Sequence, residues 1–259
     1  MTETAHELWE RLRPFAMRDI EQLANLAKRT SSSEGGAEIV LYGSKVRRYT
    51  ADEDGLRAAI GAAADYDTIT IPAVHIQLNS TLSIHKKIKL IGVRDPVRNV
   101  SLDTYHKGAV ISNAPGFVSG NLISIMVGNV ALDNLAFLFN ANSTNPVRGI
   151  SCSLSGYSFR DLLVYVNNSS SGTTYAIQVA YSAAFSRVYA FASASSGTAA
   201  GLVMGPHATT LYADLCYLEG ISTSGQGYGC VTYSCTGQIA HCGFRGTTYG
   251  LQIASYGGG

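Results

Sequence analysis

Polar residues that could do acid–base chemistry recur at a nearly constant spacing in the second half of the sequence. They are separated by 27, 26, 27 and 27 residues: Asn134, Asp161, Arg187, Asp214 and His241. If each interval forms one turn of a coil, neighbouring members lie about 5 Å apart in a column. One interpretation is an acid–base cluster of Asp214, His241 and Glu219 beside a polysaccharide groove. The other, which we favour, is a ladder of turn residues, because Asp and Asn tolerate left-handed turns and bond to their own backbone.

The cysteine and histidine residues do not have the spacing of a metal site. There are five cysteines and no C-x-x-C pair: Cys152, Cys216, Cys230, Cys235 and Cys242. A zinc site would need closer pairs with further ligands nearby, and His241 beside Cys242 is the single hint of one. We therefore expect no metal and no cofactor. We interpret the thiols as small buried apolar groups in a protein made in a reducing cytoplasm.

The polar column sits inside an apolar repeat. Five segments line up, with first residues 27, 26, 27 and 27 apart: Leu132, Phe159, Phe185, Tyr212 and Ile239. A second series follows Gly or Ala and begins at Ile150, Ile177, Leu202, Cys230 and Leu251. Two strands that recur in register at one period indicate the stacked coils of a parallel β-helix, in which alternate side chains point into a narrow core. We expect the first series, Tyr212 included, to face inward.

Two segments precede the coils. Residues 1–33 are predicted as a helical segment for assembly or anchoring, with an apolar stripe at Ile20, Leu23 and Leu26. The piece from Phe15 to Arg29 is only about four turns long, and an isolated helix of that length is marginally stable. Its apolar stripe must therefore pack on another part of the protein or on a partner. Residues 34–50 are predicted as a linker.

Residues 51–107 are predicted as a helix and the first coils. The helix covers residues 51–64, with acidic residues at its start and one apolar face: Leu56, Ala59, Ile60 and Ala63. The stretches DTITIPAV, IQLNSTLSI and KIKLIGV indicate three short strands. Residues 108–259 form the shaft, which we expect to continue beyond residue 259.

The stretch TADEDGLRAAIGAAADYDTITIP, followed by LNSTLSIHKKIKLIGV, resembles the opening of pectate-lyase-like right-handed β-helix proteins. In that superfamily a helix of the type LRAAI-x-AA covers the open end of the coil, and a strand of the type DTI-x-I-P follows. The resemblance covers about residues 50–259. It implies an all-β, right-handed parallel β-helix with an N-terminal α-helical segment and a capping helix. Ala73 stands where many relatives have glycine, so the turn must differ.

The resemblance is specific for fold and poor for function. Such folds include polysaccharide lyases, glycoside hydrolases, phage tailspikes and fibres, and inactive coils. A lyase of this kind would carry acidic calcium ligands beside an arginine or lysine base. A polygalacturonase-like hydrolase would carry an adjacent Asp-Asp and a Gly-His-Gly. The sequence shows neither pattern, which counts against catalysis by those routes.

Charge is concentrated before the shaft. Of the 37 Lys, Arg, Asp and Glu residues, 29 lie in residues 1–107 and 8 in residues 108–259, which hold 11 of the 15 tyrosines. A shaft with so few charges can lie beside copies of itself or a neutral polymer without strong repulsion. The net charge of +1 does not indicate nucleic-acid binding. No apolar run approaches the roughly 18 residues that span a bilayer, so we expect no membrane insertion.

These observations favour a structural or receptor-binding fibre or tailspike-like protein of a phage or phage-like particle, presenting its β-helix to host polysaccharide. The alternative is a polysaccharide lyase or glycoside hydrolase of the pectate-lyase-like fold. Acidic and basic residues interrupt the N-terminal stretch, which has no continuous apolar run and does not read as a secretory signal. We therefore expect synthesis in the cytoplasm and a location in a virion or extracellular particle. As in the phage fibres that it resembles, we expect a homotrimer, with other structural proteins bound through residues 1–33.

Overall fold

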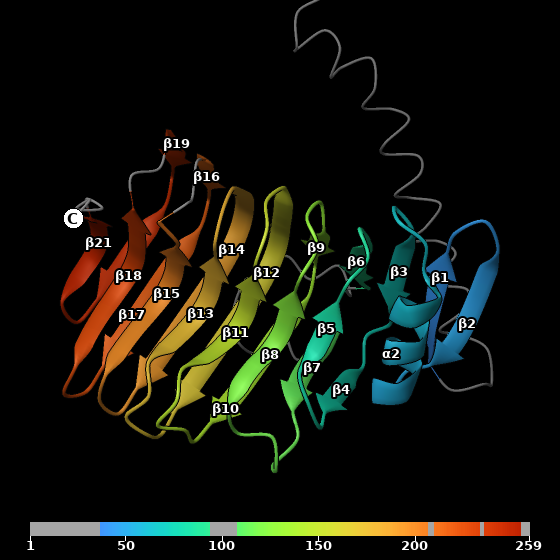
Figure 1. Cartoon of the computed structure of the whole chain (residues 1–259), viewed down its shortest axis with the longest axis horizontal. Helices are drawn as coiled ribbons and strands as arrows, with labels where there is room; N and C mark the ends of the chain where they lie inside the picture. Colours follow the sequence, from blue (N-terminus) through green and yellow to red (C-terminus); the bar gives the residue numbers. More distant parts are fainter. Residues whose placement is uncertain (1–36, 94–107, 207–209, 234–235, 255–259) are drawn as a thin grey trace, which may run out of the picture.

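The computed structural model describes residues 37–93, 108–206, 210–233 and 236–254. This part of the chain is mostly β-structure and forms a solenoid of about five turns with parallel strands, so the predicted β-helix is confirmed. Figure 1 shows the turns side by side along the long axis, with the helix α2 (Glu53–Ala62) at one end. The predicted helical segment 1–33 and its stripe of Ile20, Leu23 and Leu26 lie outside the described residues.

Strand segments from successive turns stack into three faces. The first face contains β3 (Thr68–Ile71), β6 (Lys89–Gly92), β9 (Ala131–Asp133), β16 (Thr210–Asp214), β19 (Thr236–Ala240) and the first halves of β12 (Tyr157–Asn168) and β14 (Ala183–Ala194). The second face contains β4 (His75–Leu78), β7 (Val110–Asn113), β10 (Ala136–Ala141), β17 (Tyr217–Ser222), β20 (Gly243–Gly246) and the second halves of β12 and β14. The third face contains β5 (Leu82–Ile84), β8 (Gly120–Ile125), β11 (Val147–Cys152), β13 (Thr174–Val179), β15 (Thr198–Met204), β18 (Gln226–Tyr233) and β21 (Tyr249–Ala254).

The sequence predicted two strands in each turn, but the structure has three strand segments. The first predicted strand is bent, so its two parts lie on different faces, and in β12 and β14 the two parts remain one continuous strand. In β12 the bend is at Asp161, whose φ of 52° interrupts the extended backbone. Phe159 is buried before the bend and Leu162 after it, so both segments turn an apolar side inward. The bend thus gives the first and second faces a common core.

Aromatic and aliphatic side chains stack along the axis inside the solenoid. Leu132, Phe159 and Phe185 occupy the same register position in three successive turns, and each is at most 3% exposed. The ring centroids of Phe159 and Phe185 lie 5.3 Å apart. The expected stacking of these two residues in adjacent coils is therefore confirmed.

Small residues allow the second and third faces to approach each other. An added Cβ at Gly149 would lie 2.7 Å from both the Ala176 carbonyl oxygen and Val164 Cγ1. At Gly201 it would lie 2.6 Å from the Glu219 amide nitrogen, across the narrow core. This close approach explains why Gly or Ala precedes each apolar residue of the second repeat series.

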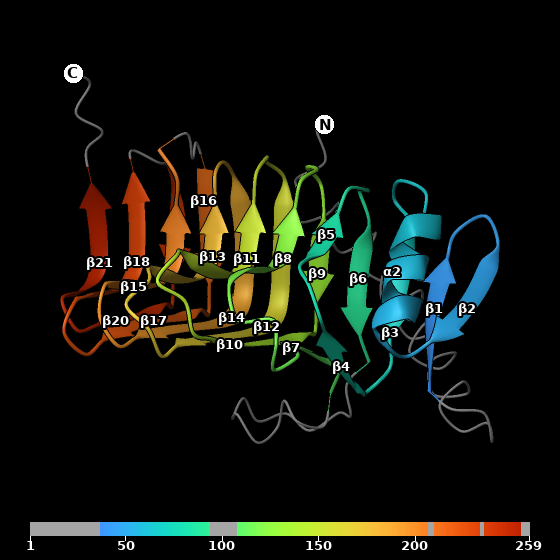
Figure 2. The same cartoon turned by 60° about the horizontal axis from the view of Figure 1, so that its bottom comes forward.

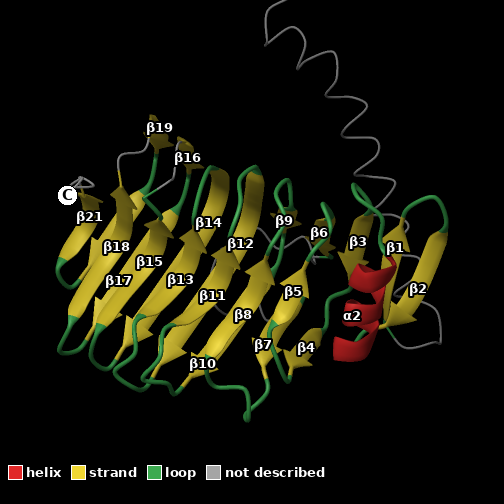
Figure 3. Ribbon diagram, in the orientation of Figure 1, coloured by secondary structure: helices red, strands yellow, loops and turns green. Residues whose placement is uncertain are grey.

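The helix α2 covers the N-terminal end of the solenoid (Figure 3). It begins after Asp52, whose carboxylate accepts a hydrogen bond of 2.8 Å from the Gly55 amide and so caps the first turn. The four predicted apolar positions are all in the core, with exposed fractions of 6% or less: Leu56, Ala59, Ile60 and Ala63. The capping role of this helix is confirmed.

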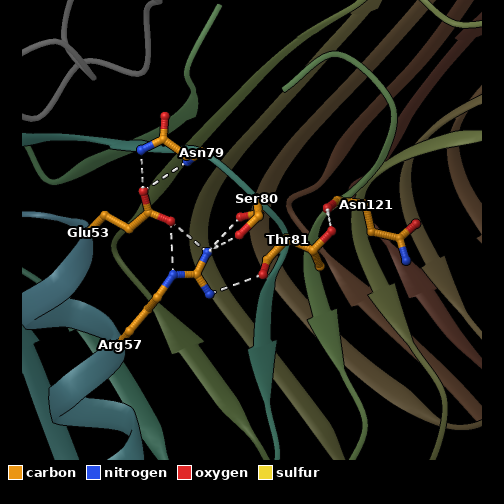
Figure 4. A network of polar contacts seen from close by, with 6 residues as sticks. All are labelled: Glu53, Arg57, Asn79, Ser80, Thr81 and Asn121. Carbon is orange, nitrogen blue, oxygen red and sulfur yellow. Dashed lines mark hydrogen bonds and ion pairs between the residues drawn. The ribbon is translucent and has the colours of Figure 1, made fainter. Parts of the chain in front are cut away.

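A polar network fixes α2 to the first turns, and we call it the cap latch (Figure 4). The guanidinium of Arg57 donates to Glu53 Oε1 at 2.7 and 2.9 Å, and to the carbonyl oxygens of Ser80 and Thr81 at 2.8 and 3.2 Å. The second oxygen of Glu53 accepts from the backbone amide and the side chain of Asn79, at 2.9 and 2.7 Å. The latch therefore joins the outer surface of the helix to the loop between β4 and β5.

The predicted linker 34–50 requires a correction, because residues 38–50 form a β-hairpin. The strand β1 (Glu38–Tyr42) pairs antiparallel with both β2 (Val46–Thr50) and β3, next to α2 (Figures 1 and 2). Ile39, Val40 and Leu41 are at most 2% exposed, so burial of a short apolar run holds this hairpin on the end of the solenoid. The predicted strand IQLNSTLSI is divided into β4 and β5 by a turn at residues 79–81.

Candidate functional site

The predicted polar column lies at the bend between the first and second faces. The left-handed residues of successive bends have φ angles between 51° and 57°: Asn134, Asp161, Arg187, Leu215 and His241. Four of the five predicted positions are confirmed, and the fourth is Leu215 in place of Asp214. Asn134 Nδ2 donates to the Gly92 carbonyl oxygen in the preceding turn at 2.8 Å, as a ladder of turn residues requires.

The correction at the fourth position follows from an uneven turn length. Phe185 pairs with Ala213, which in turn pairs with Ile239, so the fourth inward position is one place later than the repeat predicts. Tyr212 therefore pairs with Ala184 and points outward, with 55% of its surface exposed, so its predicted inward position is wrong. Asp214 pairs with Ser186 and Ala240 and comes directly before the bend.

Charges of opposite sign alternate along this bend. Arg187 binds Asp161 through two hydrogen bonds, Nε to Oδ1 and Nη2 to Oδ2, each of 2.7 Å. Hydrogen bonding to Asp161 raises the pKa of Arg187. Asp133, which is 7% exposed, accepts from Arg160 Nε at 3.2 Å and lies 3.6 Å from Lys89 Nζ. These contacts join successive turns, which favours a structural role for the column.

The structure brings together two of the three candidate catalytic residues. His241 Nδ1 lies 3.1 Å from Asp214 Oδ1, and the two side chains are 77% and 54% exposed. Glu219 lies on the second face, is 5% exposed and forms an ion pair of 3.2 Å with Arg245. The Asp214–His241 pair could exchange a proton with a ligand at the surface, but Glu219 belongs to a different environment.

The outer side of the second face carries stacked aromatic rings, which we call the aromatic ladder. Tyr165 and Phe191 have ring centroids 4.8 Å apart and an angle of 8° between their planes. Tyr189 and Tyr217 have values of 5.2 Å and 14°. The ladder continues toward α2 in an apolar cluster whose buried members are Val110, Ala136 and Leu163. Aromatic residues that recur one turn apart are the sequence signal of this surface.

The outer side of the third face combines tyrosines with hydrogen-bonding groups, and we call it the tyrosine face. Tyr175, Tyr228 and Tyr233 pack in one cluster, and the Tyr228 ring stacks on that of Tyr249 with centroids 6.1 Å apart. Toward α2, the same register column as Tyr175 contains Arg148 and Asn121. Arg148 donates to the side-chain oxygens of Asn121 and Gln178.

The described ranges contain neither a cluster of metal-ligating residues nor a helix that could span a membrane. There, no group of three or more His, Cys, Asp or Glu residues is arranged to hold a metal ion. The helix in this part of the chain is too short and polar to cross a membrane. Of the five cysteines, Cys152, Cys216 and Cys230 are buried, Cys242 is half-buried, and Cys235 lies outside the described residues.

Comparisons with known proteins give no further assignment. No family model matches the sequence, and no significant match was found among curated proteins or solved structures.

The left-handed Leu215 should be a weak point of the turn ladder. Its φ is 52° and its surface is 53% exposed, so the side chain gains little burial for an unfavourable backbone conformation. Leu215→Asn should raise the free energy of unfolding by about 0.5–1 kcal/mol, because Asn adopts the left-handed region more readily. Urea unfolding of the full chain measures this change.

Leu154→Asn is the matched control, because Leu154 is 45% exposed and is not among the residues with positive φ. We expect it to change stability by less than about 0.5 kcal/mol. A loss of stability in Leu215→Asn would show that packing by this leucine outweighs its backbone strain.

Proposed function

We propose that this protein is a structural, fibre- or tailspike-like component of a phage or phage-like particle, and that it forms a homotrimer whose outer surface binds polysaccharide. The observation that carries the proposal is the pair of different outer surfaces on one solenoid. The aromatic ladder is suited to contact with other copies of the chain. The tyrosine face is suited to contact with a neutral, hydroxyl-rich polymer.

The aromatic ladder has the properties of a protein–protein contact. Near-parallel stacking already uses the ring faces of Tyr165, Phe191, Tyr189 and Tyr217 for one another. Ring edges then remain for outside contacts, whereas a sugar ring packs best on an open aromatic face. Aromatic residues are enriched at the centres of interfaces. Glu219, which is paired with Phe191 in the next turn, has its charge balanced by an ion pair with Arg245.

The tyrosine face offers what polysaccharide binding requires. Tyr249 is 57% exposed and lies at the end of its stack, so one face of its ring is open within the described residues. Farther along, Arg148, Asn121 and Gln178 supply amide and guanidinium groups that are already held by one another. Such prearranged groups lose little side-chain entropy when they bind a ligand.

The alternative, a polysaccharide lyase or glycoside hydrolase, has one observation in its favour, the contact between His241 and Asp214. The pair is largely exposed, while effective acid–base groups usually lie in a water-excluding site that tunes their pKa. Glu219, the third candidate, is paired with Arg245 instead. The enzyme therefore remains the second candidate, and the experiment includes a readout for it.

Two variants with the same substitution can separate the tasks of the two surfaces. Tyr189→Arg places a charge in the aromatic ladder, and we expect light scattering to show a shift from three chains to one at micromolar concentration. Tyr175→Arg places the same charge on the tyrosine face, and we expect it to stay trimeric but lose retention on immobilised bacterial surface polysaccharide. Circular dichroism confirms folding of both variants.

Three outcomes would contradict the proposal. A monomeric mass of the full chain, unchanged by deletion of residues 1–33, would remove the trimer. Equal loss of polysaccharide retention in both variants would remove the division between the faces. New reducing or unsaturated ends on the polysaccharide, absent with Asp214→Asn, would establish the enzyme instead.

A further inference from the structure

Two cysteines from adjacent turns meet at the last bend of the described chain. Leu215 N donates to the Ala240 carbonyl oxygen at 3.2 Å, and Gly243 N donates to the Cys216 carbonyl oxygen at 2.8 Å. Cys216 and Cys242 lie between these two hydrogen bonds, so they occupy paired positions on neighbouring turns. The two thiols contact each other, and each also donates to the carbonyl oxygen two residues before it.

The spacing expected for residues paired on neighbouring strands matches that of a disulfide. Neighbouring strands of a sheet lie about 4.8 Å apart, and residues paired across them have a similar Cα separation. The Cα atoms of disulfide-bonded cysteines lie about 4.4–6.8 Å apart. No large movement of the backbone is therefore needed to join the two sulfur atoms.

The corresponding position in the earlier turns is a purely apolar one. Leu135, Leu162 and Val188 occupy it before Cys216 and Cys242, and each of the three is at most 1% exposed. An aliphatic side chain would fill this inward position after the bend as well as a thiol does. Two thiols in consecutive turns can also be oxidised to a disulfide, a property that packing at this position does not require.

We propose that Cys216 and Cys242 form a redox-controlled staple that closes when the protein meets a small-molecule disulfide. The half-buried Cys242 loses its proton and attacks one sulfur of the small disulfide, which releases one thiol and leaves a mixed disulfide on Cys242. Cys216 then loses its proton and attacks the Cys242 sulfur, and the second thiol leaves. Two cysteine thiols are oxidised to one disulfide, and one small disulfide is reduced to two thiols.

The order of these steps follows from burial. Cys216 is 3% exposed, and burial raises the pKa of its thiol to about 11, so it is the poorer first nucleophile. Cys242 is half-buried and can be reached from solvent. Once the mixed disulfide exists, attack by Cys216 is intramolecular and favoured by proximity.

The staple would act at the end of the described solenoid that lies away from α2. Within the described residues, β19, β20 and β21 each pair with a strand on one side only. Ile253 and Ile239 in these strands are 73% and 40% exposed. A covalent bond between the last two bends would hold this turn in place in an oxidising medium and release it in a reducing one.

Thiol counting after oxidation tests the proposal independently of the proposed function. The reduced full chain is incubated with oxidised glutathione, denatured and titrated for free thiols. We expect the count to fall from five to three and the mass to fall by about 2 Da, reversibly with dithiothreitol. Cys216→Ser and Cys242→Ser should abolish this loss, whereas Cys230→Ser and Cys235→Ser should still lose two thiols.

Hydrogen exchange provides the structural readout. Oxidation should slow amide exchange in residues 236–254 of the wild type and leave it unchanged in Cys242→Ser. A wild-type chain that keeps five thiols, while a dithiol peptide in the same solution is oxidised, would overturn the proposal. Pairing that persists in Cys216→Ser would overturn it as well.

Discussion

Phe159→Ala should lower the free energy of unfolding by about 3–5 kcal/mol, the range for removal of a fully buried aromatic ring. Phe159 is 1% exposed, and its ring packs against those of Phe185 and Tyr157, at centroid distances of 5.3 and 6.0 Å. Because each turn contacts only its neighbours, the cavity cannot be filled from elsewhere in the molecule. Thermal unfolding measures the total effect, and hydrogen exchange should show the largest loss of protection in β12 and β14.

Tyr212→Ala is the matched control for this prediction. Tyr212 is also aromatic and the repeat spacing predicts it in the same inward column, yet it is 55% exposed. We expect its removal to change stability by less than about 0.5 kcal/mol. If both substitutions cost the same, Phe185 would have to pair with Tyr212, as the sequence repeat predicts, instead of with Ala213.

The β-helix could be predicted because each turn is stacked on an equivalent one, which forces the same side-chain class to recur. The prediction failed by a single position in the turn that contains β16, where Phe185 pairs with Ala213 instead of Tyr212. A small inward Ala213 leaves no apolar signal, and the neighbouring Tyr212 and Asp214 imitate the pattern of the other turns. A constant period cannot reveal an extra residue in a loop.

The surface features were harder to predict for a related reason. Period-two alternation identifies the inward residues, but it does not say which of the residues between them meet on the outer surface. Tyr165 and Phe191 become partners only when the register is known, and so do Tyr189 and Tyr217. The hairpin at residues 38–50 was missed because β2, with the sequence VRRYT, is exposed along almost its whole length and shows no apolar pattern.

For the candidate site, the repeat spacing predicted one contact correctly and one wrongly. The repeat interval correctly brought Asp214 and His241 into contact, although only His241 has the left-handed backbone of the turn ladder. Glu219 follows Asp214 closely in the sequence, but the bend between them sends the two carboxylates to different faces. A cluster inferred from sequence therefore separates into an exposed pair, Asp214 and His241, and a buried carboxylate, Glu219, that pairs with the exposed Arg245.

Arg57→Ala should lower the free energy of unfolding by about 1–3 kcal/mol, because hydrogen bonds to charged groups carry the cap latch. The Arg57 side chain is 33% exposed, and it bridges Glu53, which is 14% exposed, to the carbonyl oxygens of Ser80 and Thr81. Its loss leaves Glu53 without a counter-charge and loosens α2 from the end of the solenoid. Urea unfolding measures the cost, and hydrogen exchange in α2 locates it.

Arg48→Ala is the matched control, since Arg48 also forms an ion pair of 2.9 Å, with Glu38, but the two side chains are 50% and 36% exposed. We expect a cost below about 1 kcal/mol for this exposed pair. If Arg48→Ala costs as much as Arg57→Ala, the bridge to the β4–β5 loop contributes nothing beyond a surface charge pair.

The pH dependence of stability gives a second view of the latch. Burial acts to raise the pKa of Glu53, but hydrogen bonds from Asn79 and Arg57 outweigh it and hold that pKa below its ordinary value. A carboxylate whose pKa is lower in the folded state stabilises the fold above the pKa of the unfolded state, about 4.3, and loses this contribution as the pH falls through the folded value. Glu53→Gln should therefore cost stability at pH 7 and flatten the acid limb of the stability curve. An acid limb as steep as that of the wild type would show that other carboxylates cause the loss, and that the latch does not depend on the charge of Glu53.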